Sequence, residues 1–93
     1  MVEVQFFSLL RLLLKQDRIS LPASKGETIM QLLQRMQEQL TTPFLHKLID
    51  AEGGLHPGTI ILVNRRNIHH LQGLQTPVND QDVVAMFPPG AGG

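Results

Sequence analysis

A single amphipathic helix between residues 28 and 40 most limits what this chain can fold into. Thr28 and Gln31 have the spacing of a capping box, in which each side chain satisfies a free backbone N–H at the helix start. An apolar stripe at helical spacing follows, made of Ile29, Leu32, Leu33, Met36 and Leu40. The opposite face carries Gln34, Gln37 and Glu38. Because a helix with one apolar stripe needs an apolar surface to cover, we expect it to pack on a sheet.

The segments before and after this helix have the character of strands. Residues 2–6 alternate apolar and polar side chains, as in a strand with one buried face, and Arg18–Leu21 alternates again and predicts an antiparallel partner. Thr59–Val63 is apolar on both faces, which is typical of a central strand. Ile68–Leu71 is expected to be its short partner, and Val83–Phe87 to be the last strand. This order predicts an α+β fold, with one helix on a mixed sheet of four to five strands.

Two segments leave alternatives open. The apolar block from Phe7 to Leu14 is either more strand or a short helical turn. Its part from Leu9 to Leu14 is either core packing or, if partly exposed, a binding surface. Thr42 and Pro43 have the pattern of a helix start and predict a second, shorter turn that carries Phe44, Leu45 and Leu48.

The composition narrows the classes of function. The 93 residues are 42% hydrophobic, which suits one domain with a thin core, and eight basic residues balance eight acidic ones. This balance argues against a nucleic-acid-binding charge field and favours local, mainly apolar recognition. The absence of cysteine excludes disulfides and thiolate chemistry. With no leader and no long apolar run, we expect a soluble cytoplasmic protein.

The chain ends in an unusual segment, Phe87-Pro88-Pro89-Gly90-Ala91-Gly92-Gly93. We expect one domain over residues 1–87 and an exposed, flexible tail over residues 88–93. The prolines stiffen its base, whereas the last glycines have no Cβ and can enter a narrow channel. Fully extended, the six tail residues span roughly 20 Å. The terminal carboxylate is ionised at neutral pH and is a poor acyl donor, so any acyl chemistry has to begin with its activation.

Segments along the whole chain resemble the ubiquitin-like β-grasp sulfur carriers, which include the small subunit of molybdopterin synthase (MoaD) and the thiamine-pathway carrier ThiS. The resemblance rests on Val4-Gln5-Phe6-Phe7 with Leu10-Arg11, Thr28-Ile29 through Leu32, Leu62-Val63-Asn64, Asp80-Gln81-Asp82-Val83-Val84, Phe87-Pro88-Pro89 and Gly92-Gly93. It is closest to MoaD. Gln81 stands where these proteins usually have glycine, and Gly90 stands where they commonly have a bulkier residue.

The resemblance implies a carrier with no catalytic site and no bound cofactor. An E1-like enzyme of the MoeB or ThiF type would use ATP to adenylate the Gly93 carboxylate. A cysteine desulfurase or rhodanese would then supply sulfur for a thiocarboxylate, which a large subunit of the MoaE type would use to make molybdopterin. The residues implied in partner binding are Gly92, Ala91, Pro89, Pro88, Phe87 and Arg11. The chain has no Gly-x-x-x-x-Gly-Lys-Ser/Thr phosphate loop, so ATP binding falls to the partner.

Other functions and other roles for these residues stay open. The chain could be a ThiS-like or other biosynthetic sulfur carrier, a modifier joined to lysines, or a plain interaction domain. Phe87 is either a core residue or a partner-facing anchor, and Arg11 either a solvated charge or a partner salt bridge. Arg65-Arg66 is interpreted as a polar turn.

The histidines give no metal-binding pattern. His69 and His70 are neighbours on an expected strand and would point to opposite faces, which is wrong for two ligands of one metal. His46 and His56 lack carboxylate or cysteine neighbours at ligand spacing. We therefore expect no metal site.

Overall fold

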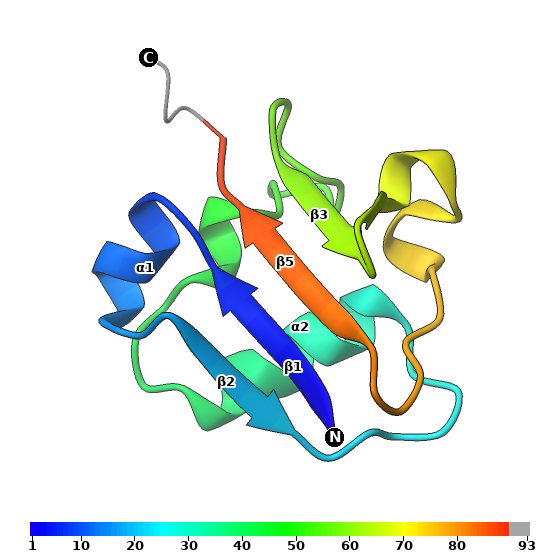
Figure 1. The fold of residues 1–93 in the computed structure, drawn as a ribbon. Coiled ribbons are helices and arrows are strands. Elements are labelled where there is room, and N and C mark those ends of the chain that lie inside the picture. Colours follow the sequence, from blue (N-terminus) through cyan, green and yellow to red (C-terminus); the bar gives the residue numbers. More distant parts are fainter. Residues whose placement is uncertain (90–93) are drawn as a thin grey trace.

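A computed structural model describes residues 1–89 as a five-stranded sheet with one main helix packed on one face (Figure 1). The strands lie in the order β2-β1-β5-β3-β4. Their bounds are β1 (Val2–Phe6), β2 (Arg18–Leu21), β3 (Ile60–Val63), β4 (Arg66–Asn67) and β5 (Val83–Phe87). The expected fold class, a β-grasp with one main helix, is confirmed.

The first and last strands are neighbours at the middle of the sheet. β1 runs parallel to β5, with Val4 opposite Val84, and the predicted antiparallel pairing of β1 with β2 is confirmed. On its other side β5 pairs antiparallel with β3. Because β5 has a partner along both edges, the chain leaves the sheet from its most enclosed strand.

The helix α2 (Ile29–Gln39) begins as the sequence predicts. The backbone N–H of Gln31 donates to Thr28 Oγ1 at 3.3 Å, and the backbone N–H of Thr28 donates to Gln31 Oε1 at 3.0 Å. Four residues of the apolar stripe are fully buried against the sheet, Ile29, Leu32, Leu33 and Met36. They meet the inward side chains of the central strands, among them Val4, Phe6, Ile61, Val84 and Met86.

Gln37 has a structural role that the periodicity did not indicate. Its side-chain oxygen accepts the backbone N–H groups of Phe44 at 2.9 Å and Leu45 at 3.0 Å. This contact starts η1 (Leu45–Lys47), so Thr42 is not the cap that the sequence suggested. Phe44 is fully buried at this point and ties the long connection after α2 to the core.

The apolar block after β1 forms a helix, α1 (Leu9–Leu14), so the helical alternative is correct. The antiparallel strands β1 and β2 are therefore joined by a helical segment and not by a tight turn. Leu10 and Leu14 are buried, whereas Leu9 and Leu12 are 52% and 73% exposed. One side of the block is therefore core and the other is exposed apolar surface, so its role as a binding surface stays a prediction.

The prediction of a strand over Ile68–Leu71 is wrong. Its place is taken by a 3-10 helix, η2 (Ile68–His70), followed by η3 (Gly73–Gln75). Asn67 causes the change, because its side-chain oxygen accepts the backbone N–H of His69 at 2.9 Å and turns the chain. The short partner of β3 is β4, which follows a turn with positive φ at Asn64 and Arg65. Arg65 lies in the turn, as expected, whereas Arg66 is the first residue of β4.

β3 is not the central strand that its composition predicts. It lies second from the edge, and Ile60 at its start is 41% exposed. The apolar residues on its outer side lie beside β5, with Ile60 opposite Phe87 and Leu62 opposite Ala85. The two-sided apolar pattern therefore reflects an apolar outer face of the sheet.

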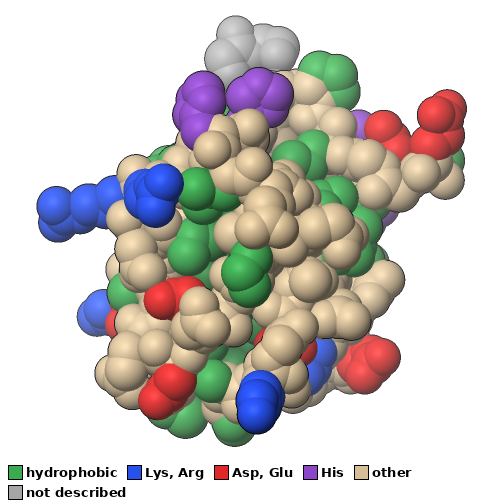
Figure 2. Space-filling view, turned by 90° about the vertical axis from the view of Figure 1, so that its right-hand side faces the viewer, with side chains coloured by type: hydrophobic (Ala, Val, Ile, Leu, Met, Phe, Trp, Pro, Cys, Tyr) green, Lys and Arg blue, Asp and Glu red, His purple; other side chains and the backbone are tan. Residues whose placement is uncertain are grey.

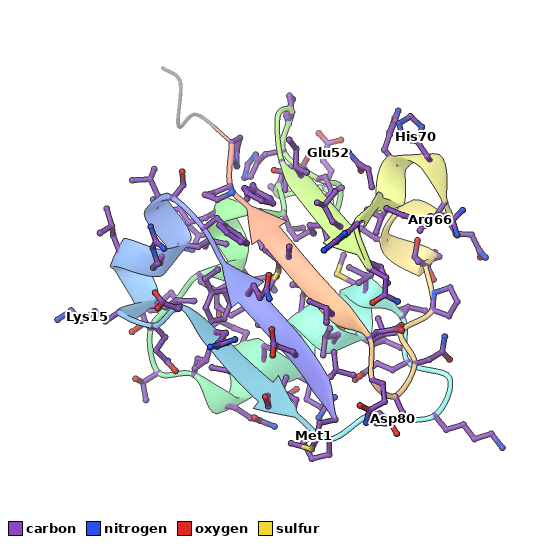
Figure 3. The ribbon with its side chains drawn as sticks, viewed as in Figure 1. Met1, Lys15, Glu52, Arg66, His70 and Asp80 are labelled. Atoms are coloured by element: carbon purple, nitrogen blue, oxygen red, sulfur yellow. The ribbon has the colours of Figure 1, made fainter. Side chains whose placement is uncertain are left out.

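The acidic turn before β5 is held by side-chain contacts. The Asn64 side-chain amide donates to Asp82 at 2.8 Å, and its oxygen accepts the backbone N–H of Val83 at 2.9 Å. Met1 and Asp80 lie next to each other at the lower edge of the molecule (Figure 3). The hydrogen bond from the Met1 α-ammonium lowers the pKa of Asp80 below its ordinary value.

Gln81 adopts a left-handed backbone conformation in this turn, with φ of 73°. This explains why glycine suits the position, since a side chain there is strained by about 1–2 kcal/mol. We expect Gln81→Gly to raise the free energy of unfolding by about 1 kcal/mol, measured by urea denaturation. As a control, Gln72→Gly places glycine at an exposed residue with φ of −114° and is expected to lower stability. A loss of stability in Gln81→Gly would contradict the strain.

Candidate functional site

The base of the tail lies against the domain. Pro88 is buried and Pro89 is partly buried, which differs from the expectation of an exposed tail from residue 88 onward. The predicted site residues Gly93, Gly92 and Ala91, together with Gly90, lie outside the described residues. The described part of the chain therefore ends with two prolines seated at the end of β5.

A loop that precedes β3 supports this seat. Asp50 organises its turn, because Oδ1 accepts the backbone N–H groups of Glu52 at 2.9 Å and Gly54 at 3.0 Å. Backbone hydrogen bonds from Gly54 and Glu52 lower the pKa of Asp50 below its ordinary value. A bridge between Ile49 and Leu55 closes the turn and leads the chain to Gly58.

Gly58 lies in this loop, beside the base of the tail. Its φ is +90°, and a Cβ added there would lie 3.4 Å from Pro89 Cβ. The sequence analysis missed this residue, although the turn pattern His56-Pro57-Gly58 before a strand was a signal for it. The positive φ of Gly58 therefore shapes the loop that lies beside Pro89.

Replacing Gly58 is expected to strain its loop and to change the surroundings of Pro89. Gly58→Ala should lower the free energy of unfolding by about 1–3 kcal/mol, because alanine is strained at this φ. It should also shift the NMR signals of Pro89. Gly53→Ala is the matched control, because Gly53 has a φ of +86° but no heavy atom within 4 Å of its added Cβ. Equal Pro89 shifts in both variants would show that the loop at Gly58 does not lie beside Pro89.

Phe87 lies on the outer face of the sheet, away from α2. Its ring stacks on that of Phe7, with centroids 4.3 Å apart and planes 11° from parallel. A hollow of about 540 Å³ lies over this face, lined by Gln5, Phe7, Leu62, Asn64, Arg65, Val83, Ala85 and Phe87. We call this surface the outer apolar face. Phe87 is half-buried there, so it is not a core residue.

The role of Phe7 was not inferred from the sequence. The parallel register places Phe6 opposite Met86, both in the core, so the next pair, Phe7 and Phe87, points outward together. The backbone N–H of Phe7 donates to the Met86 carbonyl at 3.2 Å and extends the pairing to this point. The signal was the doubled aromatic Phe6-Phe7, in which successive side chains of a strand face opposite sides.

Arg11 lies on α1 and is not part of the outer apolar face. Its Nε is 3.9 Å from Asp17 Oδ1, and the two side chains are 55% and 79% exposed. An exposed pair at this distance contributes little to stability. The partner contact expected for Arg11 stays a prediction.

The histidines and the charged surface offer little chemistry of their own. The rings of His69 and His70 meet edge to face, with centroids 5.4 Å apart, so the argument that they point to opposite faces is wrong. Within residues 1–89, no group of three or more metal-ligating side chains comes together.

Figure 2 shows acidic and basic side chains interspersed over one side of the molecule. No helix of residues 1–89 is long and apolar enough to cross a bilayer.

The sheet order, the single covering helix and the central last strand define a small ubiquitin-like protein of the β-grasp class. The sequence pattern of the ThiS family matches residues 4–93. The chain therefore belongs to the ThiS family of ubiquitin-like sulfur carriers.

Known proteins that are similar to this chain agree with the family. A candidate sulfur carrier protein of Archaeoglobus fulgidus is 34% identical over 86 residues, which cover 82% of this chain and 97% of that protein. Small archaeal modifier protein 3 of Haloferax volcanii is 30% identical over 92 residues, covering 99% and 98% of the two chains. The solution structure of Urm1 from Trypanosoma brucei superposes with a TM-score of 0.81 at 27% identity, covering 99% and 94%.

Proposed function

We propose that this chain carries sulfur on Gly93 as a thiocarboxylate after activation by an E1-like enzyme. The observation that carries the proposal is the position of the Gly92-Gly93 tail, which continues from the central strand β5 through Pro88 and Pro89. The match to the ThiS family supports it. ATP is then a substrate of the activating partner and not a cofactor of this chain.

The chemistry has two steps. A Gly93 carboxylate oxygen attacks the α-phosphorus of ATP, which releases pyrophosphate and leaves an acyl-adenylate. Hydrosulfide then attacks the acyl carbon, AMP leaves, and the thiocarboxylate remains. If a protein persulfide attacks instead, the product is an acyl disulfide, which a thiol reduces to the thiocarboxylate. A cysteine desulfurase or a rhodanese would supply the persulfide.

The outer apolar face suits the contact with the activating enzyme. It lies at the end of β5 from which the tail leaves, and aromatic side chains with apolar neighbours are common anchors in protein interfaces. We assign Phe87, together with Phe7, to this contact. In this arrangement the partner holds the domain by its sheet while the last residues reach the partner's active site.

The acceptor of the sulfur is the finer part of the proposal. Delivery to a large molybdopterin synthase subunit of the MoaE type stays a prediction, since the relatives described above bear the names of a sulfur carrier and a modifier. Delivery in another biosynthetic pathway uses the same activated terminus. Copurification of the untagged chain with a synthase subunit would identify the acceptor.

A second candidate function is protein modification, favoured by the similarity to small archaeal modifier protein 3. Here a lysine Nζ of another protein attacks the activated acyl carbon and forms an isopeptide bond. The two functions differ in their products. Larger species in native lysate that vanish when Gly93 is deleted would support modification.

The test of sulfur loading is an intact-mass measurement. The untagged chain is incubated with the E1-like enzyme of the same genome, ATP and sulfide, and we expect the mass change of one oxygen-to-sulfur exchange at the terminus. The control is the chain that lacks Gly92 and Gly93, and its mass should not change. If the acyl-adenylate forms normally but no oxygen-to-sulfur exchange follows, the sulfur-carrier function is contradicted. The modifier function would then remain.

A further inference from the structure

An open groove of about 790 Å³ runs beside the base of the tail, separate from the outer apolar face. Its walls come from α1, from η1, from the loop before β3 and from the two prolines after β5. The lining residues that matter here are Leu9, Leu12, Leu13, Lys47, Pro88 and Pro89. Among residues 1–89, none lines both this groove and the hollow over the outer apolar face. We call it the α1 groove.

The wall of the α1 groove is apolar and accessible. Leu9 is 52% exposed and Leu12 is 73% exposed, and both line it together with the partly buried Leu13. Single exposed leucines are ordinary on protein surfaces, whereas a contiguous group of leucines and prolines around one hollow marks a binding surface.

The backbone that holds these leucines is strained. Ser8, directly before α1, has φ of 54° and ψ of −131°, a region that usually requires glycine, and its side chain makes no capping hydrogen bond. Lys15, directly after α1, is also left-handed, with φ of 57°. The leucines of this six-residue helix are thus carried by a backbone that is strained at Ser8 and ends in the left-handed conformation common at helix C-termini.

The polar rim of the groove favours a negative partner. The polar residues that line the groove are Lys47, which carries a positive charge, and His46 and His56. His56 is held in place, because its Nε2 lies 2.8 Å from the carbonyl oxygen of His46. Within the described part of the chain, no aspartate or glutamate lines the groove. An apolar floor with this rim is complementary to an apolar segment that also carries carboxylates.

We propose that the α1 groove binds a segment of the E1-like enzyme that activates the tail. This segment carries both leucine-like apolar side chains and carboxylates. This inference rests on the proposed function and adds a second contact to it. Pro88 and Pro89 line the groove, so a segment bound there lies against the base of the tail. Two contacts, on the outer apolar face and in the α1 groove, enclose the exit of the tail from both sides and fix the direction in which it leaves.

The test uses Leu12→Asp and Lys47→Glu in the full chain, with Lys25→Glu as the matched control. Lys25 undergoes the same charge reversal but does not line the groove. Pyrophosphate release by the purified E1-like enzyme is measured against carrier concentration. We expect the KM for the carrier to rise about 10-fold in each groove variant with kcat unchanged, because docking away from the reacting carboxylate contributes uniform binding. Circular dichroism and urea denaturation verify that the variants are folded.

Each other outcome overturns the inference. An unchanged KM in both groove variants means that the enzyme does not use the groove, and an equal effect of Lys25→Glu means that only overall charge matters. Concentration-dependent dimerisation in sedimentation, lost in Leu12→Asp, would assign the groove to a second copy of this chain.

A binding measurement separates this inference from the proposed function. The isotope-labelled chain is titrated with the unlabelled enzyme, without ATP, and NMR shifts are expected at Leu9, Leu12 and Lys47. If these shifts occur but no thiocarboxylate forms, the groove assignment stands and the sulfur-carrier function fails. If thiocarboxylate forms and the shifts are confined to the outer apolar face, the groove assignment fails.

Discussion

The Gly92→Val substitution is expected to lower the rate of thiocarboxylate formation about 100-fold. Displacing a reacting group by about 1 Å has an effect of this size. A β-branched side chain next to the last residue blocks a channel shaped for backbone alone and restricts the backbone beside the acyl carbon. The fold is unaffected, because the substitution lies beyond β5. The measurement is the initial rate of oxygen-to-sulfur exchange by intact mass, with the activating enzyme in excess.

The control for this prediction is Ala91→Gly, which removes a Cβ one position earlier and is expected to keep the rate near that of the natural chain. Comparable rates in Gly92→Val and Ala91→Gly would mean that the terminus is not threaded through a narrow channel. They would also remove the main reason for a diglycine end.

Phe44→Ala is expected to lower the free energy of unfolding by about 3–5 kcal/mol. The Phe44 side chain is fully buried where η1 begins, and its removal leaves a cavity between the loop after α2 and the core. This is a large part of the roughly 5–15 kcal/mol typical of a domain. The measurement is urea denaturation followed by circular dichroism.

Leu12→Ala is the control for the cavity, since Leu12 is 73% exposed and its truncation should change stability by less than about 0.5 kcal/mol. A similar small effect in Phe44→Ala would show that the loop after α2 is not anchored by this ring. In that case Gln37, which bonds the backbone of Phe44 and Leu45, would hold the loop by itself.

The parts of the fold that could be predicted have local causes. α2 follows from the capping pair Thr28 and Gln31 and from its apolar stripe, and β1 follows from alternation over residues 2–6. Each signal depends only on residues within one element, so tertiary contacts had little to change.

The errors arose where a particular side-chain hydrogen bond or a contact between strands decides the structure. Ile68 begins a 3-10 helix because the Asn67 side chain bonds the backbone of His69, which an apolar and polar pattern does not reveal. The outward apolar residues of β3 are explained only by Phe87 and Ala85 on the neighbouring strand. For α1, the leucine-rich block fits a helix or a strand, and its conformation depends on how Leu10 and Leu14 pack.

The candidate site divides in the same way. The importance of Phe87 and the prolines could be inferred from the tail pattern, whereas the stacking of Phe7 and the contact of Gly58 with Pro89 depend on strand register and loop path. The α1 groove needs four separated segments to come together. Beforehand, its leucines were visible as a block with two possible roles and its prolines as the base of the tail.

The position of β5 has a mechanical consequence for the tail. A partner that draws the last residues into a channel pulls along the axis of β5, which is bonded to β1 on one edge and to β3 on the other. Such tension loads both rows of hydrogen bonds at once in shear, whereas an edge strand could be peeled away one bond at a time. The partner can thus stretch the tail taut while the domain that anchors it stays folded.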